Sequence, residues 1–226
     1  MNSLPHRSTL AGLALISLPC LAAADDIEPP WWRGAPLTVS AAWEFPVPPQ
    51  DWLAIAPDAV SSVGSDEMPS LFFDGFETHA QVDHASNWTW VSADGDGGIT
   101  PDTGVPSAVV AFHVANWVDD MLAKVLRAQI TWTGQDPPEV FALTGFKAAD
   151  SIHGFILDGP TLVDDTHLVI DWMIFGWNPD WELLEISVPQ GTSLDEVVID
   201  TWSYFPAPGT AAILGIALIA LAPRTR

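Results

Sequence analysis

The sequence predicts an all-β fold: an antiparallel, jelly-roll-like β-sandwich flanked by an N-terminal signal helix and a C-terminal apolar helix. From Leu71 onward, short runs of aromatic and β-branched residues alternate with Gly, Pro and Asp, a spacing typical of sandwich strands. Between Val125 and Thr133 the residues that would face a core occupy every second position, as in a strand with one buried side. The chain is 48% hydrophobic and has 12 Trp and 10 Phe, so it can bury a core.

The chain divides into a signal peptide at 1–24, a Pro-rich segment at 25–69, the sandwich at 70–205 and a tail at 206–226. The Pro-rich segment holds eight prolines, which exclude long helices, so we expect one strand there and irregular chain packed on the domain. The expected strands are Leu37 to Trp43, Leu71 to Phe73, Trp88 to Val91, Ala108 to Val114, Val125 to Thr133, Val140 to Thr144, Gly154 to Leu157, His167 to Phe175, Glu182 to Val188 and Val197 to Trp202.

Residues 117–126 fit two local structures. Apolar residues at 118, 121, 122, 125 and 126 form a helical stripe, with Asn116 placed as an N-cap. The same residues overlap the strand that begins at Lys124. We expect a single helical turn from Trp117 to Leu122, followed by the strand.

The N-terminus has the pattern of a secretory signal. Arg7 precedes an apolar stretch from Leu10 to Leu21, and Ala22-Ala23-Ala24 form a small-residue cleavage site before Asp25. Signal peptidase is therefore an expected partner, with Ala22, Ala24 and Asp25 at the cleavage site. Cys20, the one cysteine of the chain, would leave with the signal, so a disulfide is excluded.

The C-terminus carries a short apolar run, Ala211 to Ala222, bounded by prolines and followed by basic residues. As a helix, its 12 residues would span about 18 Å, well short of a hydrocarbon core of about 30 Å. Pro208 and Pro206 prevent the helix from extending backwards. We expect a removable sorting segment that contacts the membrane only before processing, with its basic end in the cytoplasm.

This tail resembles the PEP-CTERM sorting signal of Gram-negative bacteria. The resemblance implies recognition by a membrane-embedded exosortase, delivery to the cell surface or medium, and association with exopolysaccharide or biofilm. It covers residues 206–226 alone, and Ala207 stands where the namesake motif has Glu. The matching sorting-motif positions are Pro206, Ala207, Pro208, Gly209, Thr210, Arg224 and Arg226.

The charge balance excludes several kinds of partner. The chain has 29 acidic and 7 basic side chains, a formal net charge of −22. Nucleic acid and anionic headgroups both need clustered Lys and Arg, so neither is an expected ligand.

No standard catalytic motif occurs: the chain has no G-x-S-x-G, H-E-x-x-H, P-loop or G-x-G-x-x-G. Glu182 with Glu185, or Asp164 with Asp165, would suit a glycosidase pair, but 29 acidic residues make such neighbours common by composition. We therefore expect no catalytic residue and no enzyme. A secreted hydrolase is kept as the second alternative.

Two groups of residues are candidates for binding a metal ion. Asp94-Gly95-Asp96-Gly97-Gly98, followed by Asp102, fits either a calcium loop or a plain hairpin turn, although the full EF-hand pattern fails at Gly98 and Val105. His79, Asp83 and His84 are close along the chain, but in an extended strand His84 would point away from the other two. We expect a solvated loop there. No cofactor other than calcium is suggested.

The tryptophans are candidates for glycan binding. Trp31 with Trp32, or the loop with Trp177 and Trp181, would present flat apolar surfaces suited to stacking on sugar rings. Four others lie within strand patterns and are expected in or near the core, since large apolar side chains are mostly buried. These are Trp43, Trp132, Trp172 and Trp202.

Together these features predict an exported, non-enzymatic protein of the cell envelope, cell surface or extracellular matrix, associated with exopolysaccharide. The first alternative is a carbohydrate-binding module that uses a Trp platform and calcium.

Overall fold

The computed structural model describes residues 28–63, 72–73, 76–93, 96–117, 123–147, 150–153, 155–175 and 179–204. In this part of the chain the fold is all-β with antiparallel pairing, as predicted, and the single helical element is the 3-10 turn η1 (Ala85–Asn87). The predicted signal helix and apolar tail lie outside the described residues.

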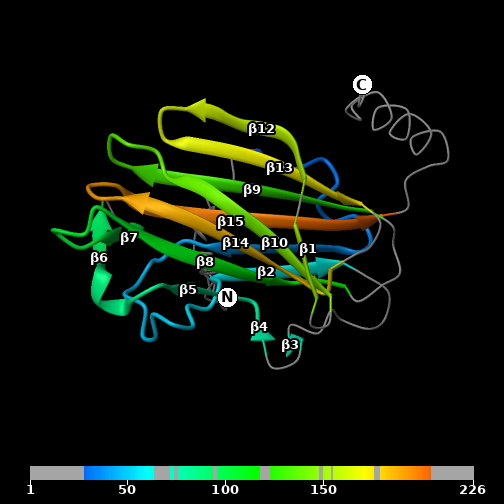
Figure 1. Cartoon of the computed structure of the whole chain (residues 1–226), viewed down its shortest axis with the longest axis horizontal. Helices are drawn as coiled ribbons and strands as arrows, with labels where there is room; N and C mark the ends of the chain where they lie inside the picture. The colour runs from blue at the N-terminus through cyan, green and yellow to red at the C-terminus, as the bar shows by residue number, and fades with distance from the viewer. Residues whose placement is uncertain are drawn as a thin grey trace, which may run out of the picture.

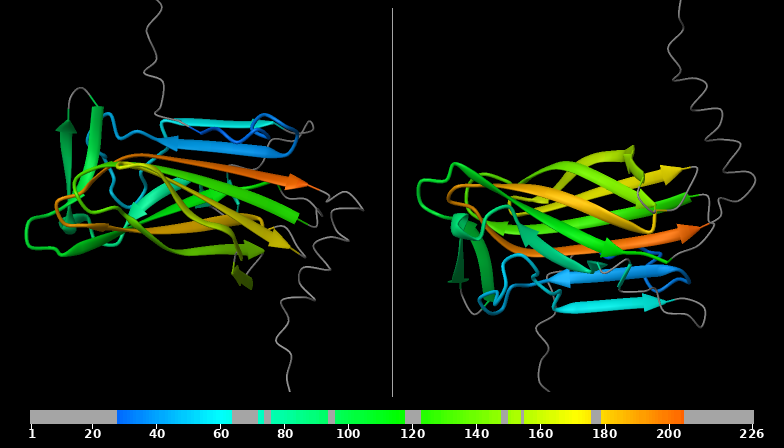
Figure 2. Two further views of the ribbon diagram at one scale, coloured as in Figure 1. Left: turned by 90° about the horizontal axis from the view of Figure 1, so that it is seen from above. Right: turned by 60° about the horizontal axis from the view of Figure 1, so that its bottom comes forward.

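The larger sheet has eight strands, with the order β12-β13-β9-β15-β1-β2 and the hairpin β6–β7 attached through β7 and β15 (Figure 1). The two further views in Figure 2 show this hairpin standing crosswise at one end of the molecule. The strands are β12 (Phe155–Asp164), β13 (His167–Phe175), β9 (Ala123–Thr133), β15 (Ser193–Tyr204), β1 (Thr38–Trp43), β2 (Ala59–Val63), β6 (Trp88–Ala93) and β7 (Asp96–Pro101).

The smaller sheet has five strands in the order β11-β10-β14-β8-β5, and a separate two-stranded sheet pairs β3 with β4. The bounds are β11 (Asp150–His153), β10 (Glu139–Lys147), β14 (Trp181–Pro189), β8 (Ser107–Ala115), β5 (His79–Val82), β3 (Phe72–Phe73) and β4 (Phe76–Glu77).

The two larger sheets share one hydrophobic core. Along β9 every second side chain from Leu126 to Trp132 is at most 2% exposed, because successive side chains of a strand point to opposite faces. The strand β14 repeats this pattern from Glu182 to Val188. Trp43 on β1 contacts Phe112 on β8, with ring centroids 4.9 Å apart, and thereby joins the larger sheet to the smaller. All these apolar side chains belong to a single buried cluster.

Every predicted strand has a counterpart in the described part of the chain, and five strands observed there, β2, β4, β5, β7 and β11, were not predicted. The ambiguous stretch is settled at its C-terminal end, since Ala123 already begins β9, so a helix continuing to Leu126 is excluded. The predicted helical turn falls almost wholly on residues 118–122, outside the described residues.

Candidate functional site

The segment before β1, residues 28–36, lies across the outer face of the larger sheet. The Glu28 amide donates to Gln129 Oε1 on β9 at 2.8 Å, and Trp202 Nε1 on β15 donates to the Pro36 carbonyl at 3.1 Å. Two turn hydrogen bonds, from Arg33 N to Pro30 O and from Ala35 N to Trp32 O, fold the segment back on itself. Side chains of this segment are thereby brought onto the outward residues of β9 and β15.

Four aromatic side chains meet there and form what we call the aromatic patch: Trp31, Trp32, Trp202 and Tyr204. Trp202 is its centre. Trp32 stacks on it at 5.9 Å and 20°, Tyr204 stacks at 4.7 Å and 19°, and Trp31 meets it edge-on at 5.6 Å and 79°. Trp32 is 8% exposed, whereas Trp31 is 86% exposed. The patch therefore has a packed base and one indole displayed to solvent.

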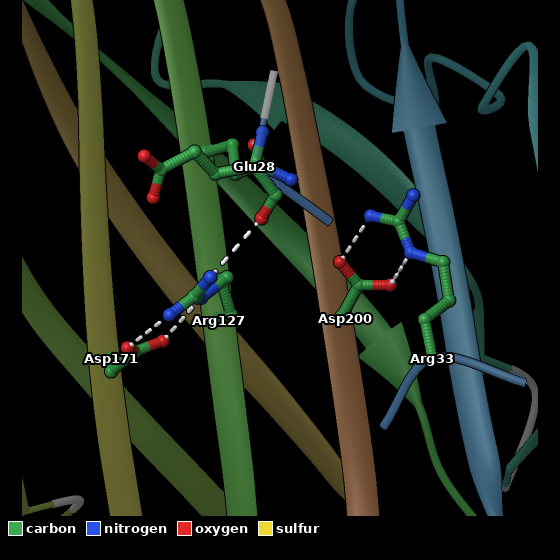
Figure 3. Close-up of polar contacts among 6 residues, drawn as sticks. Glu28, Arg33, Arg127, Asp171 and Asp200 are labelled. Carbon is green, nitrogen blue, oxygen red and sulfur yellow. Dashed lines mark hydrogen bonds and ion pairs between the residues drawn. The ribbon is translucent and has the colours of Figure 1, made fainter. Parts of the chain in front are cut away.

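A row of alternating charges crosses β13, β9 and β15, the last of which also carries Trp202 of the aromatic patch; Figure 3 shows the charged residues. Asp171 on β13, Arg127 on β9 and Asp200 on β15 are successive cross-strand partners. Arg127 donates to both carboxylate oxygens of Asp171 at 2.7 Å and also to the Glu28 carbonyl at 3.1 Å. Arg33 donates to both oxygens of Asp200 at 2.7 and 2.5 Å. Both guanidinium groups are held in the forked geometry that fixes a side chain most firmly.

The hydrogen bonds to Asp171 are the largest cause of a raised pKa for Arg127, against the opposing effect of burial. Arg127 therefore keeps its positive charge at every ordinary pH. At the border of the aromatic patch, each arginine is paired with an aspartate, so the charges of the row are fixed in position and cancel one another.

Trp181, at the start of β14, lies elsewhere. It stacks on His113 of β8 at 5.5 Å, and His79 of β5 stacks on His113 at 4.4 Å. Burial, together with the neighbouring His79, lowers the pKa of His113 to about 4. Because β5, β8 and β14 belong to the smaller sheet, Trp181 does not join Trp31 and Trp32 in one platform. Trp177 lies outside the described residues.

The four tryptophans predicted to lie in strands differ in burial. Trp43, Trp132 and Trp172 are 0%, 2% and 3% exposed, as expected of core residues. Trp202, which was expected in or near the core, is half-buried and faces outward, where Trp32 covers it. The residues on either side of it, Thr201 and Ser203, point into the core although they are polar. For this reason the sequence did not reveal which face of β15 is buried.

In the predicted calcium loop, Asp94 lies outside the described residues, as does the side chain of Asp96. Asp96 pairs with Ala93 between β7 and β6, the register of a two-residue hairpin connection. Asp102 accepts a hydrogen bond from the Thr89 hydroxyl. Among the described side chains no three His, Cys, Asp or Glu residues gather closely enough to hold a metal ion.

The neighbouring acidic pairs do not face each other across a cleft. Glu182 points into the core and Glu185 to the outer face of β14, because three positions along a strand change the side. Asp164 is exposed and accepts from the Thr166 amide, the main cause of its lowered pKa. His84 is exposed as well, and Asp83 accepts a hydrogen bond from Trp88 Nε1 at 3.2 Å.

A second surface feature is a hollow of about 380 Å³ within the Pro-rich segment. It is lined by Phe45 to Asp51, Ala54 to Ala56 and Asp58. Among the described residues no helix is long and apolar enough to cross a membrane.

The chain matches no protein-family model, and no curated protein matches it.

Proposed function

We propose that this protein is an exported, non-enzymatic surface or matrix protein that associates with exopolysaccharide through the aromatic patch. We also infer that its two main sheets form a jelly-roll-like β-sandwich. The proposal rests on the environment of Trp31. Its side chain is 86% exposed, and its ring packs edge-to-face against the half-buried Trp202.

The chemistry of the aromatic patch suits a sugar ring. An indole offers an apolar face that can stack on the C–H face of a pyranose, and its own N–H supplies a polar contact. Sugar-binding surfaces also need polar groups close to the ring, and the partly exposed Arg33 guanidinium, held in place by the buried Asp200, supplies donors there. Because Trp32 and Tyr204 both stack on Trp202, the support for Trp31 is ordered before a ligand arrives.

The net charge of the chain indicates which class of polysaccharide it can bind. At a formal −22, the protein repels acidic polymers, and in the aromatic patch each arginine is already paired with an aspartate. The expected ligand is therefore a neutral polysaccharide.

The delivery part of the proposal rests on sequence. Residues 1–24 have the pattern of a secretory signal, and 206–226 resemble the PEP-CTERM signal, whose implied processing enzyme is an exosortase. These two features would place the aromatic patch outside the cytoplasm, where exopolysaccharide is found.

Affinity electrophoresis of the purified protein in gels containing a neutral glucan, a neutral mannan or acidic alginate tests the binding claim. We expect retardation by at least one neutral polymer and none by alginate. Trp31→Ala should weaken that retardation at least about tenfold, equivalent to about 1.4 kcal/mol, because it removes the displayed ring.

The control is Leu53→Ala, which removes another exposed apolar side chain, 59% exposed, outside the aromatic patch. Trp31→Tyr should retain part of the binding. Equal retardation of wild type and Trp31→Ala would show that the aromatic patch is not the site.

A further inference from the structure

A polar cluster is enclosed between the two main sheets at one end of the core. It consists of Lys124, Glu182, Asn116 and Thr201, which are 1%, 0%, 1% and 1% exposed. Asn116 directly follows β8 and Glu182 lies on β14, both in the smaller sheet; Lys124 and Thr201 lie on β9 and β15 of the larger sheet. Polar groups this deeply buried have a large effect on stability or chemistry, because water does not solvate them.

The Glu182 carboxyl group connects an amine to an amide. Lys124 Nζ lies 3.2 Å from Glu182 Oε1, and Asn116 Nδ2 donates a hydrogen bond to Glu182 Oε2. The carbonyl oxygen of the same amide, Asn116 Oδ1, accepts a hydrogen bond from Thr201 Oγ1 at 3.0 Å. The Asn116 backbone amide is fixed as well, by a 3.0 Å hydrogen bond to the Asp180 carbonyl. The amine of Lys124 and the amide of Asn116 thus both contact the Glu182 carboxyl group, in a site buried from water.

The environment favours the neutral forms that amide chemistry requires. Burial is the largest influence on Glu182 and raises its pKa, against the opposing effects of Lys124 and Asn116. Transfer of a proton from the Lys124 ammonium to Glu182 replaces two buried charges with a neutral amine and a neutral acid. A neutral amine is a nucleophile, and the Thr201 hydrogen bond polarises the Asn116 carbonyl toward attack.

We propose that Lys124 and Asn116 join in an intramolecular isopeptide bond, with Glu182 carrying the proton between them. The amine lone pair of Nζ attacks Asn116 Cγ, and Thr201 stabilises the negative charge that develops on Oδ1. Glu182 takes one proton from Nζ and delivers a proton to Nδ2. The Cγ–Nδ2 bond then breaks and ammonia leaves, while Glu182 returns to its starting state. The Nζ–Cγ bond replaces the Cγ–Nδ2 bond, and no oxidant, reductant or other co-reactant is consumed.

The product would tie the end of β8 in the smaller sheet to the start of β9 in the larger one. The one cysteine, Cys20, precedes the described residues, so this part of the chain has no disulfide. An isopeptide bond gives an exported domain a covalent tie that does not depend on redox conditions.

Mass spectrometry of the purified full chain tests the proposal directly. Cleavage before aspartate separates residues 102–118, which contain Asn116, from residues 120–135, which contain Lys124. We expect these two peptides to remain joined, with a mass lower than their sum by one ammonia molecule. Two separate peptides of unmodified mass would overturn the proposal. So would a loss of water that joins Lys124 to Glu182 instead.

Variants test the assigned roles. Glu182→Gln should abolish the joined peptide, whereas the matched control Glu185→Gln, on the opposite face of the same strand, should leave it intact. Thr201→Val should reduce the joined fraction measured soon after refolding, because the carbonyl loses its hydrogen bond. Circular dichroism and tryptophan fluorescence identify any variant that does not fold, and the wild-type peptides decide the question even if Glu182→Gln is unfolded.

Discussion

At the residue scale, adjacent tryptophans have opposite environments. Trp32 is packed on Trp202 and nearly buried, whereas Trp31 leaves 86% of its surface in water. A large exposed aromatic side chain is unfavourable for solubility unless a ligand or partner covers it. Because so little of its surface is buried, Trp31 contributes little to the stability of the domain, which is consistent with the proposed role in binding.

A second residue-scale prediction concerns His113. The pKa of this side chain is lowered to about 4 in the folded protein, below the value of about 6.5 for a free histidine. Between these values the unfolded chain binds the proton more tightly, so stability is full above about pH 6.5 and falls as the pH drops toward 4. The loss is at most about 3 kcal/mol.

Urea denaturation at several pH values measures this effect. His113→Gln should flatten the pH dependence between about 4 and 6.5, while the exposed His84→Gln should leave it unchanged. An equally steep decline in wild type and His113→Gln would assign the acid sensitivity to the carboxylates instead.

At the scale of elements, Gly97 and Gly98 of the run Asp94-Gly95-Asp96-Gly97-Gly98 are required by packing, which the sequence did not reveal. A Cβ atom on Gly97 would lie 1.9 Å from the Phe45 carbonyl oxygen, which also accepts a hydrogen bond from Trp90 Nε1 at 2.8 Å. On Gly98 it would lie 2.4 Å from Ser193 Oγ. Both glycines let β7 approach its neighbours closely, whether or not the loop before them binds a cation.

Gly97→Ala should therefore destabilise the domain by about 2 to 3 kcal/mol, since the backbone contact with Phe45 cannot yield without displacing the chain. Gly191→Ala is the matched control. Gly191 has a φ of +84° and open space around it, so the substitution should cost only about 1 kcal/mol of backbone strain. Equal losses in thermal or urea unfolding would contradict the close-approach explanation.

The calcium hypothesis belongs to the same hairpin. If Asp94, Asp96 and Asp102 bind calcium, millimolar calcium should raise the melting temperature, because binding to the folded state alone stabilises it. Asp96→Ala should remove that rise, while Asp58→Ala, a change to another surface acid, should retain it. A melting curve that calcium does not shift in the wild type would exclude the site.

A strand could be predicted from the sequence, with its buried side, only where apolar and polar residues alternate clearly along it. The strand β9 was found because Leu126, Ala128 and Ile130 occupy alternate positions, and the structure buries all three. The outward face of β15 was missed because its inward positions include the polar Thr201. The aromatic patch was predicted only in part: Trp31 and Trp32 were candidates, but Trp202 and the Arg33–Asp200 pair meet them through contacts across more than 160 positions, which local patterns do not record.

The buried cluster was missed for a related reason. Glu182 drew attention as a neighbour of Glu185, and Asn116 as a helix cap, whereas their actual partners lie across the core. Contact between the inward faces of two sheets is a property of the tertiary fold and has no sequence spacing of its own.

At the scale of the whole molecule, the domain combines strong acidity with one core shared by its two main sheets. Acidity of this size keeps a protein soluble and disfavours contact with anionic surfaces. Both properties suit a protein that is displayed outside the cell, where the proposed polysaccharide ligand lies.

Export and sorting are the claims on which the proposed function depends, and the termini of the native protein test them. Mass spectrometry of the protein recovered from cell envelope and culture medium should find a chain that begins at Asp25 and lacks the apolar run from Ala211 to Ala222. An untrimmed chain in both fractions, from Met1 through Arg226, would contradict both processing steps and the surface role inferred from them.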